Sequence, residues 1–149
     1  MGSVRVASAE GLLLLDTHAW IWLNTGDTRR IGKKAAQRVT RAAARGRLRL
    51  SVISVWELGL LHARGQIRFS TTLDEWIRTA LATPGLTLED LTPEIALDSS
   101  RLAGELHPDP ADRIIVSTAR HLNAALVTRD QRLLHYSEEG WIKALDAST

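Results

Sequence analysis

The chain contains no cysteine and no long hydrophobic run. The absence of cysteine excludes disulfide bonds and thiolate metal sites, so any metal ion must be held by oxygen or imidazole ligands. No apolar stretch approaches the roughly 20 residues of a membrane-spanning helix. Residues 1–10 also lack the apolar core of a signal peptide. We therefore expect a cytoplasmic protein that has no membrane segment.

Acidic residues are missing from one stretch of the chain, between Thr28 and Trp56. This stretch carries nine basic residues, namely Arg29, Arg30, Lys33, Lys34, Arg38, Arg41, Arg45, Arg47 and Arg49. The formal net charge is +2, so subtracting these nine leaves −7 for the remainder. A basic block beside an acidic remainder indicates a polyanion partner and a cation-binding site, although a solvated helix face would have the same composition.

Apolar runs that suit strands alternate along the chain with segments of helical pattern. Strands are expected at residues 12–15, 48–53, 86–91 and 125–128, with an edge strand at 141–145. Helices are expected at residues 18–23, 33–45, 54–63, 71–82, 93–106, 111–123 and 131–135. This alternation predicts an α/β fold with a mainly parallel sheet. The length of 149 residues predicts one domain, at residues 11–149, preceded by an N-terminal extension at residues 1–10.

Two of the predicted strands end in a carboxylate. Asp16 follows the apolar run at residues 12–15, and Asp130 follows the run at residues 125–128. Ligands of open α/β sheets bind outside the carboxyl ends of the strands, and parallel strands place those ends at one edge. We therefore expect Asp16 and Asp130 to lie at the same edge. Asp is also a favoured N-cap, so Asp16 has an alternative interpretation as a helix cap.

Two further acids stand at predicted helix starts. Glu57 is the only charged residue among residues 51–61, and an unpaired carboxylate in such surroundings costs several kcal/mol. Its spacing from Ser54 also suits a capping box, which would explain Glu57 structurally. Asp109 can cap the next helix, which leaves Asp112 in the first turn. One cap needs only one acid, so the second acid favours a functional site.

Carboxylates brought to one edge repel each other, and their pKa values rise unless a cation neutralises them. An oxygen ligand set favours Mg²⁺ or Mn²⁺, and such an ion activates water for phosphodiester cleavage. The five histidines show no close metal-binding spacing, and we expect them to pack or to lie at the surface. Trp20, Trp22, Trp56 and Trp76 are expected in core or dimer contacts.

Four sequence blocks resemble the PIN-domain family, in particular the VapC toxins of bacterial toxin–antitoxin pairs. The blocks are LLDTHAWIW at residues 14–22, SVWEL at 54–58, DPADRIIVSTA at 109–119 and LVTRD at 126–130. The resemblance implies a three-layer α/β/α fold with a parallel sheet of four or five strands. It also implies a metal-dependent endoribonuclease, a homodimer, and neutralisation by a cognate VapB-like antitoxin.

Carried over by position, the resemblance assigns the four family acids to Asp16, Glu57, Asp112 and Asp130. It implies that Asp16, Asp112 and Asp130 bind the metal ion, directly or through water. Glu57 then completes the coordination or orients the attacking water.

The remaining assignments concern supporting residues. Asp109 is expected to assist through water, and Thr17 and Thr128 to position a metal-bound water or a phosphate. Arg113, or the basic block, is expected to hold the RNA backbone.

Other function classes fit the residues less well. A non-catalytic nucleic-acid or antitoxin-binding module would keep the basic block but would not need all four acids. A phosphoryl-transfer enzyme with an aspartyl nucleophile would want a second Asp at position 18, where the chain has His18. A dinucleotide-binding domain would need a glycine-rich turn after the first strand, and the chain has none there.

Overall fold

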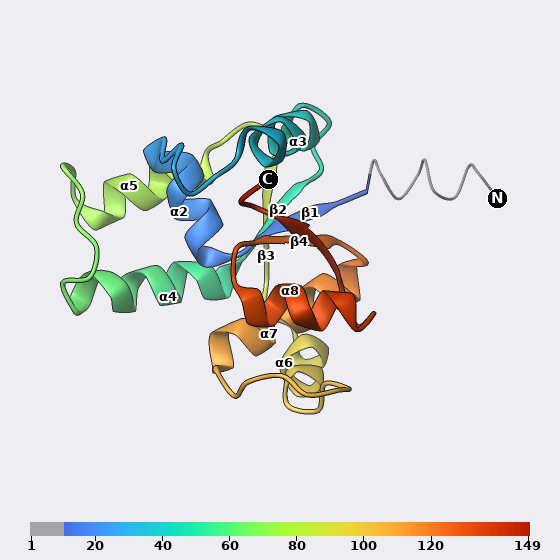
Figure 1. Cartoon of the computed structure of the whole chain (residues 1–149). Coiled ribbons are helices and arrows are strands. Elements are labelled where there is room, and N and C mark those ends of the chain that lie inside the picture. Colours follow the sequence, from blue (N-terminus) through green and yellow to red (C-terminus); the bar gives the residue numbers. More distant parts are fainter. Residues whose placement is uncertain (1–10) are drawn as a thin grey trace.

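A computed structural model describes residues 11–149, which form a five-stranded parallel sheet with helices on both faces (Figure 1). The strands are β1 (Leu13–Leu15), β2 (Leu48–Ser51), β3 (Leu86–Glu89), β4 (Ala125–Thr128) and β5 (Lys143–Asp146). The helices are α2 (Thr17–Thr25), α3 (Lys33–Ala44), α4 (Val52–Ala63), α5 (Leu73–Leu81), α6 (Pro93–Ser99), α7 (Pro110–Leu122) and α8 (Gln131–Glu138). The expected three-layer α/β/α fold is confirmed, whereas the expected extension at residues 1–10 lies outside the described residues.

The two faces of the sheet carry separate hydrophobic clusters. Leu13 and Leu15 pack with buried residues of α2, α3, α4 and α5 on one face. Leu14 packs with α7 and α8 on the other face. Successive side chains of a strand point to opposite faces, so this run of leucines is buried on both sides. The continuous apolar pattern at residues 12–15 therefore reflects a central strand.

The strand order β3-β2-β1-β4-β5 places β1 beside β4 in the middle of the sheet. From β1 the chain proceeds outward to β2 and β3, and it then returns to β4 and proceeds to β5 on the other side. The connection reverses direction between β1 and β4, and such switch points are where α/β sheets bind ligands. Asp16 follows β1 there, and its backbone N–H donates to the carbonyl of Val127 in β4 at 3.1 Å.

Most predicted elements differ from the observed ones by one to three residues at their ends, and one helix differs by more. The helix expected over residues 93–106 ends at Ser99. The hydroxyls of Ser99 and Ser100 donate to the carbonyls of Ala96 and Leu97, each at 2.6 Å. Such bonds from serine side chains compete with continuation of the helical backbone. Residues 100–109 consequently form a long connection between α6 and α7.

Within residues 11–149, no helix has the length and apolar character needed to cross a membrane.

Candidate active site

Five acids meet in one cleft at the carboxyl ends of the strands. The cleft has a volume of about 400 Å³. The acids that line it, together with Thr17, are Asp16, Glu57, Asp109, Asp112 and Asp130. They come from the starts of α2, α7 and α8 and from the second turn of α4, so only the folded sheet brings them together.

Asp16 is both a helix cap and a buried acid of the cleft. Its Oδ1 accepts a hydrogen bond from the backbone N–H of Ala19 at 2.8 Å, which caps α2. Only 8% of the residue is exposed. Burial raises the pKa of Asp16 to about 6, and repulsion from Asp112 adds to this against the hydrogen bonds from Thr128 and Ala19. The Asp16 side chain therefore both caps α2 and contributes a carboxylate to the cleft.

The capping-box interpretation of Glu57 is wrong. Ser51 is the residue that caps α4, with its Oγ accepting from the N–H of Ile53 at 3.2 Å. Ser54 is instead bonded to the Thr17 hydroxyl at 2.9 Å. Glu57 thus lies one turn into the helix, where no capping role applies.

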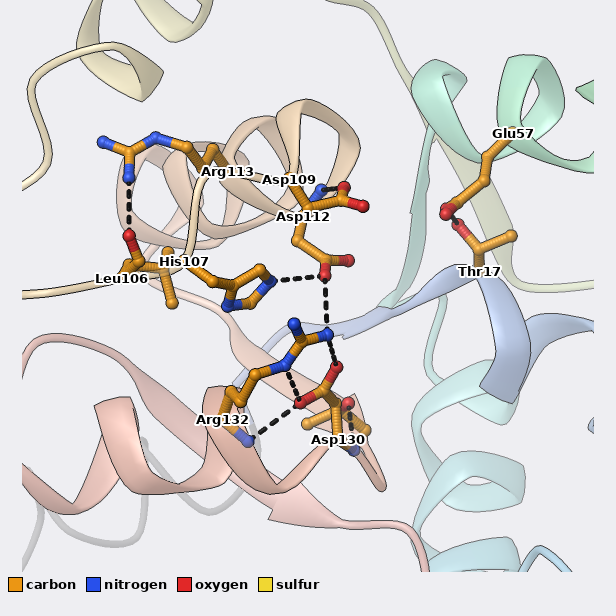
Figure 2. Close-up of polar contacts among 10 residues, drawn as sticks. Thr17, Glu57, Leu106, His107, Asp109, Asp112, Arg113, Asp130 and Arg132 are labelled. Carbon is orange, nitrogen blue, oxygen red and sulfur yellow. Dashed lines mark hydrogen bonds and ion pairs between the residues drawn. The ribbon is translucent and has the colours of Figure 1, made fainter.

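The Glu57 carboxylate is held by a hydroxyl rather than by a cation. Thr17 donates a hydrogen bond to its Oε1 (Figure 2). Burial raises the pKa of Glu57, and repulsion from Asp112 and Asp109 adds to the rise. Among residues 11–149, Glu57 has no ion-pair partner in the structure. An acid in this state binds a cation readily when one is supplied.

Asp112 is the electrostatic centre of the cleft. Asp109 caps α7 by accepting from the backbone N–H of Asp112 at 3.0 Å, so the Asp112 side chain has no capping role. Burial raises the pKa of Asp112, and repulsion from Asp109 and Asp130 adds to the rise. Asp112 in turn raises the pKa values of Asp16 and Glu57. Removing the charge of Asp112 would relieve the repulsion that it shares with Asp16, Glu57, Asp109 and Asp130.

Asp130 differs from the other acids because an arginine neutralises it. Its Oδ1 accepts from the backbone N–H of Arg132 at 2.8 Å and caps α8. Arg132 Nη2 lies 3.0 Å from Asp130 Oδ2 and 4.0 Å from Asp112 Oδ2 (Figure 2). Burial would raise the pKa of Asp130, but the bonds and charge of Arg132 outweigh it and hold this pKa below its usual range. Arg132 therefore bridges two carboxylates of the cleft.

Arg132 is not among the site residues predicted from the sequence, although a signal was present. A basic residue in the first turn of a helix opposes the helix dipole. A nearby anion offsets this opposition, and Arg132 has two such neighbours.

His107 was also missed. Its Nε2 forms a hydrogen bond with Asp112 Oδ2 at 2.7 Å, and its side chain is only 12% exposed. His107, Asp112 and Asp130 each offer a ligand atom, and these atoms lie within 4.8 Å of one another. His107 belongs to the connection before α7, so no regular spacing in sequence relates it to the acids.

Two of the expected supporting residues do not line the cleft. Arg113 turns away, and its Nη1 donates to the carbonyl of Leu106 at 3.1 Å (Figure 2). Its Nε donates to the carbonyl of Ser99 at 2.9 Å. It thereby anchors the connection that carries His107. Thr128 is fully buried; it hydrogen-bonds to Asp16 and accepts from the backbone N–H of Asp130 at 3.0 Å.

The basic block is divided by the fold. Four of its members line a separate cavity of about 240 Å³ beside the amino ends of β1 and β2, namely Arg38, Arg41, Arg45 and Arg47. That edge of the sheet is opposite the acidic cleft. Arg30 alone of the block stacks on a residue of the cleft, Trp22.

The donor chemistry of the cleft fits a hard divalent cation. Carboxylate oxygens are the preferred ligands of Mg²⁺, and an added imidazole also suits Mn²⁺. Asp112, Asp130 and His107 form the closest group of such donors in residues 11–149. Asp16 and Glu57 line the same cleft with raised pKa values, which a bound cation would lower.

Comparisons with known proteins agree with this architecture. A family model of the PIN domain matches residues 13–139. The chain is 31% identical over 121 residues to Ribonuclease VapC22 of Mycobacterium tuberculosis, covering 81% of this chain and 88% of that protein.

Solved structures share the fold at lower identity. VapBC2 from Rickettsia felis, bound to a promoter DNA fragment, superposes with a TM-score of 0.66 at 16% identity, covering 91% of this chain and 98% of that one. DNA-bound VapBC from Salmonella typhimurium gives 0.64 at 18% identity, with the same coverage. The match of the family model and the identity to a VapC relative lead to one conclusion. The chain belongs to the PIN-domain family and, within it, to the VapC-type proteins.

Proposed function

We propose that the chain is a metal-dependent endoribonuclease toxin that hydrolyses RNA phosphodiester bonds and is neutralised by a VapB-like antitoxin. The observation that carries this proposal is the convergence of Asp16, Glu57, Asp109, Asp112 and Asp130 in one cleft, where burial raises the pKa values of Asp16, Glu57 and Asp112. Such an arrangement is unfavourable unless a cation joins it. The naming of a relative as a ribonuclease supports RNA as the substrate.

The metal ion would be Mg²⁺ or Mn²⁺, and Asp16, Asp112 and Asp130 would hold it directly or through water. When bound, the ion supplies an activated water and neutralises charge on the scissile phosphate. His107 holds the Asp112 carboxylate in orientation through its 2.7 Å hydrogen bond. Thr128 does the same for Asp16.

Glu57 acts as the general base that takes a proton from the attacking water. Glu57 lines the cleft without an ion-pair partner among residues 11–149, and a positioned carboxylate is one of the groups that serve as general bases. The Thr17 hydroxyl fixes one of its oxygens by a hydrogen bond to Oε1. Arg132, with a side chain that is 61% exposed, is able to leave Asp130 and contact a substrate phosphate.

Two helices carry exposed apolar side chains that are candidates for contacts with partner proteins. Trp56 on α4 is 53% exposed, and Leu97 on α6 is 54% exposed. Tryptophan is enriched at protein interfaces relative to the rest of the surface. We assign these surfaces to the antitoxin and to a second copy of the chain in a homodimer.

The test is cleavage of RNA by the parent and by Asp16→Asn, with Mg²⁺, with Mn²⁺ and with chelator. We expect cleavage by the parent only when a metal ion is present, and a loss of at least a hundredfold in the variant. A parent that binds RNA without cleaving it would favour the non-catalytic module. Cleavage by the variant at the parental rate would refute the assignment of Asp16 to the active site.

A further inference from the structure

An aromatic and cationic cluster extends from the acidic cleft along α2. His18 and Trp22 lie one turn apart on this helix, with ring centroids 5.6 Å apart. The guanidinium carbons of Arg30 and Arg129 lie 5.7 and 5.9 Å from the centroid of the Trp22 ring. Arg129 immediately precedes Asp130, so the cluster begins next to the acids.

The cluster joins two cavities. Trp22 and His18 line the acidic cleft, and both also line a neighbouring cavity of about 470 Å³. That second cavity includes the side chains of Arg30 and Arg68. The two cavities therefore adjoin along this face of α2, which gives an elongated ligand a path away from the acids.

The charges favour a polyanion along this path. The acids of the cleft repel a nucleic-acid backbone except where a metal ion neutralises them, so binding must come from cations beside these acids, such as Arg129 at the rim of the cleft and Arg30 next to it. Arg30 is already paired with Asp27 at 2.6 Å. Arg129 has a weaker attachment, a 3.4 Å hydrogen bond from its Nη1 to the carbonyl of Arg30. Arg129 is thus the cation of the cluster that is most available to a phosphate.

The Trp22 ring supplies what phosphate contacts cannot, a flat apolar surface for a base. Unpaired bases stack on aromatic side chains and on arginine planes in single-stranded RNA recognition. Trp22 has arginines at its ring and is half-buried, so its orientation is fixed before a ligand binds. A duplex cannot use such a surface, because its bases are already stacked.

We propose that Trp22, Arg129 and Arg30 form a subsite for one unpaired nucleotide of the RNA substrate, next to the scissile phosphate. The base stacks on Trp22, and Arg129 binds the adjoining phosphate. The subsite rests on the proposed ribonuclease function.

The experiment measures binding apart from cleavage. A fluorescein-labelled, unstructured single-stranded RNA of twelve nucleotides is titrated with protein in chelator, and fluorescence anisotropy is followed. Trp22→Leu keeps an apolar side chain but removes the stacking surface, and Trp22→Phe restores an aromatic ring. Trp141→Leu, which removes a 37% exposed indole elsewhere, is the matched control.

We expect Trp22→Leu to bind the single strand about tenfold more weakly, Trp22→Phe within about threefold of the parent, and Trp141→Leu like the parent. Arg129→Gln should weaken binding and reduce the salt dependence by about one phosphate contact. Arg101→Gln, which removes an arginine paired with Asp98 at 3.1 Å, should do neither. With metal ion present, Trp22→Leu should raise KM more than it lowers kcat.

Parental binding by Trp22→Leu would overturn the subsite. So would equal binding of the same RNA as a duplex, because paired bases cannot stack on the ring. Metal-dependent cleavage by the parent is measured in parallel, so that failure of the subsite alone is distinguishable from failure of the ribonuclease function.

Discussion

Replacing Asp16 by Asn should stabilise the metal-free protein while it abolishes metal-dependent cleavage. The pKa of Asp16 is about 6 in the fold, against an ordinary value of 3.8. Because the folded pKa is the higher one, the ionised carboxylate is disfavoured by folding. Its contribution to stability is most favourable below pH 4 and is lost as pH rises through 6.

The magnitude follows from this difference of about two pKa units, which corresponds to about 3 kcal/mol at pH 8. Asn removes the charge and caps helices as well as Asp, so the bond from Ala19 is kept. For a domain of this size we expect the melting temperature of Asp16→Asn to exceed the parental value by about 6–12 °C at pH 8. At pH 5 roughly half of the advantage should remain, because the parental carboxylate is then mostly protonated.

Thermal melts in chelator at both pH values measure the effect. Asp130→Asn is the matched control, because Asp130 also caps the helix after its strand but has a lowered pKa. A carboxylate whose pKa is lower in the folded than in the unfolded state stabilises the fold when the pH is above its unfolded pKa. Asp130→Asn should therefore lower the melting temperature at pH 8. An Asp16→Asn protein that melts no higher than the parent, or whose advantage does not change with pH, would refute the reasoning.

Three further variants test the surroundings of the acids. His107→Gln should weaken Mn²⁺ binding severalfold and Mg²⁺ binding little, because imidazole suits transition metals; calorimetric titration with each ion checks this, and equal effects would contradict it. Arg132→Gln removes a cation that bridges Asp130 and Asp112, so the Kd for Mn²⁺ should fall; an unchanged Kd would show that Arg132 does not compete with the ion. Arg113→Gln leaves two loop carbonyls without their donors and should cost about 1–3 kcal/mol in urea unfolding, and a loss below about 0.5 kcal/mol would contradict the anchoring role.

The sequence predicted the sheet well because its central strands are short apolar runs buried on both faces. Leu13, Leu14 and Leu15 carry that signal without any tertiary information. The acids at the strand ends were placed for the same reason, since parallel strands share an edge.

Capping and function were not separable from sequence alone. Asp16 performs a cap and lines the cleft, so both interpretations describe it. For Glu57 the capping and functional interpretations are separated by the structure, in which Ser51, rather than Ser54, caps α4.

Tertiary contacts account for what sequence reasoning missed. His107 and Arg132 contact Asp112 only in the folded protein, and no periodic spacing in the sequence indicates these contacts. The basic block was interpreted as one binding region because its residues are close together in the sequence. In space α3 is about 18 Å long, and it carries Arg38 and Arg41 to the far edge of the sheet.

The position of β4 has a consequence for the chain during synthesis. Strands β1, β2 and β3 are made early and can pair with one another, yet β4 must later add to the open edge of β1. Asp112 and Asp130 arrive with this late half, so a ribosome-bound fragment that stops before them holds an incomplete set of acids. The set of acids at this edge of the sheet is therefore complete only after β4 and the start of α8 have been made.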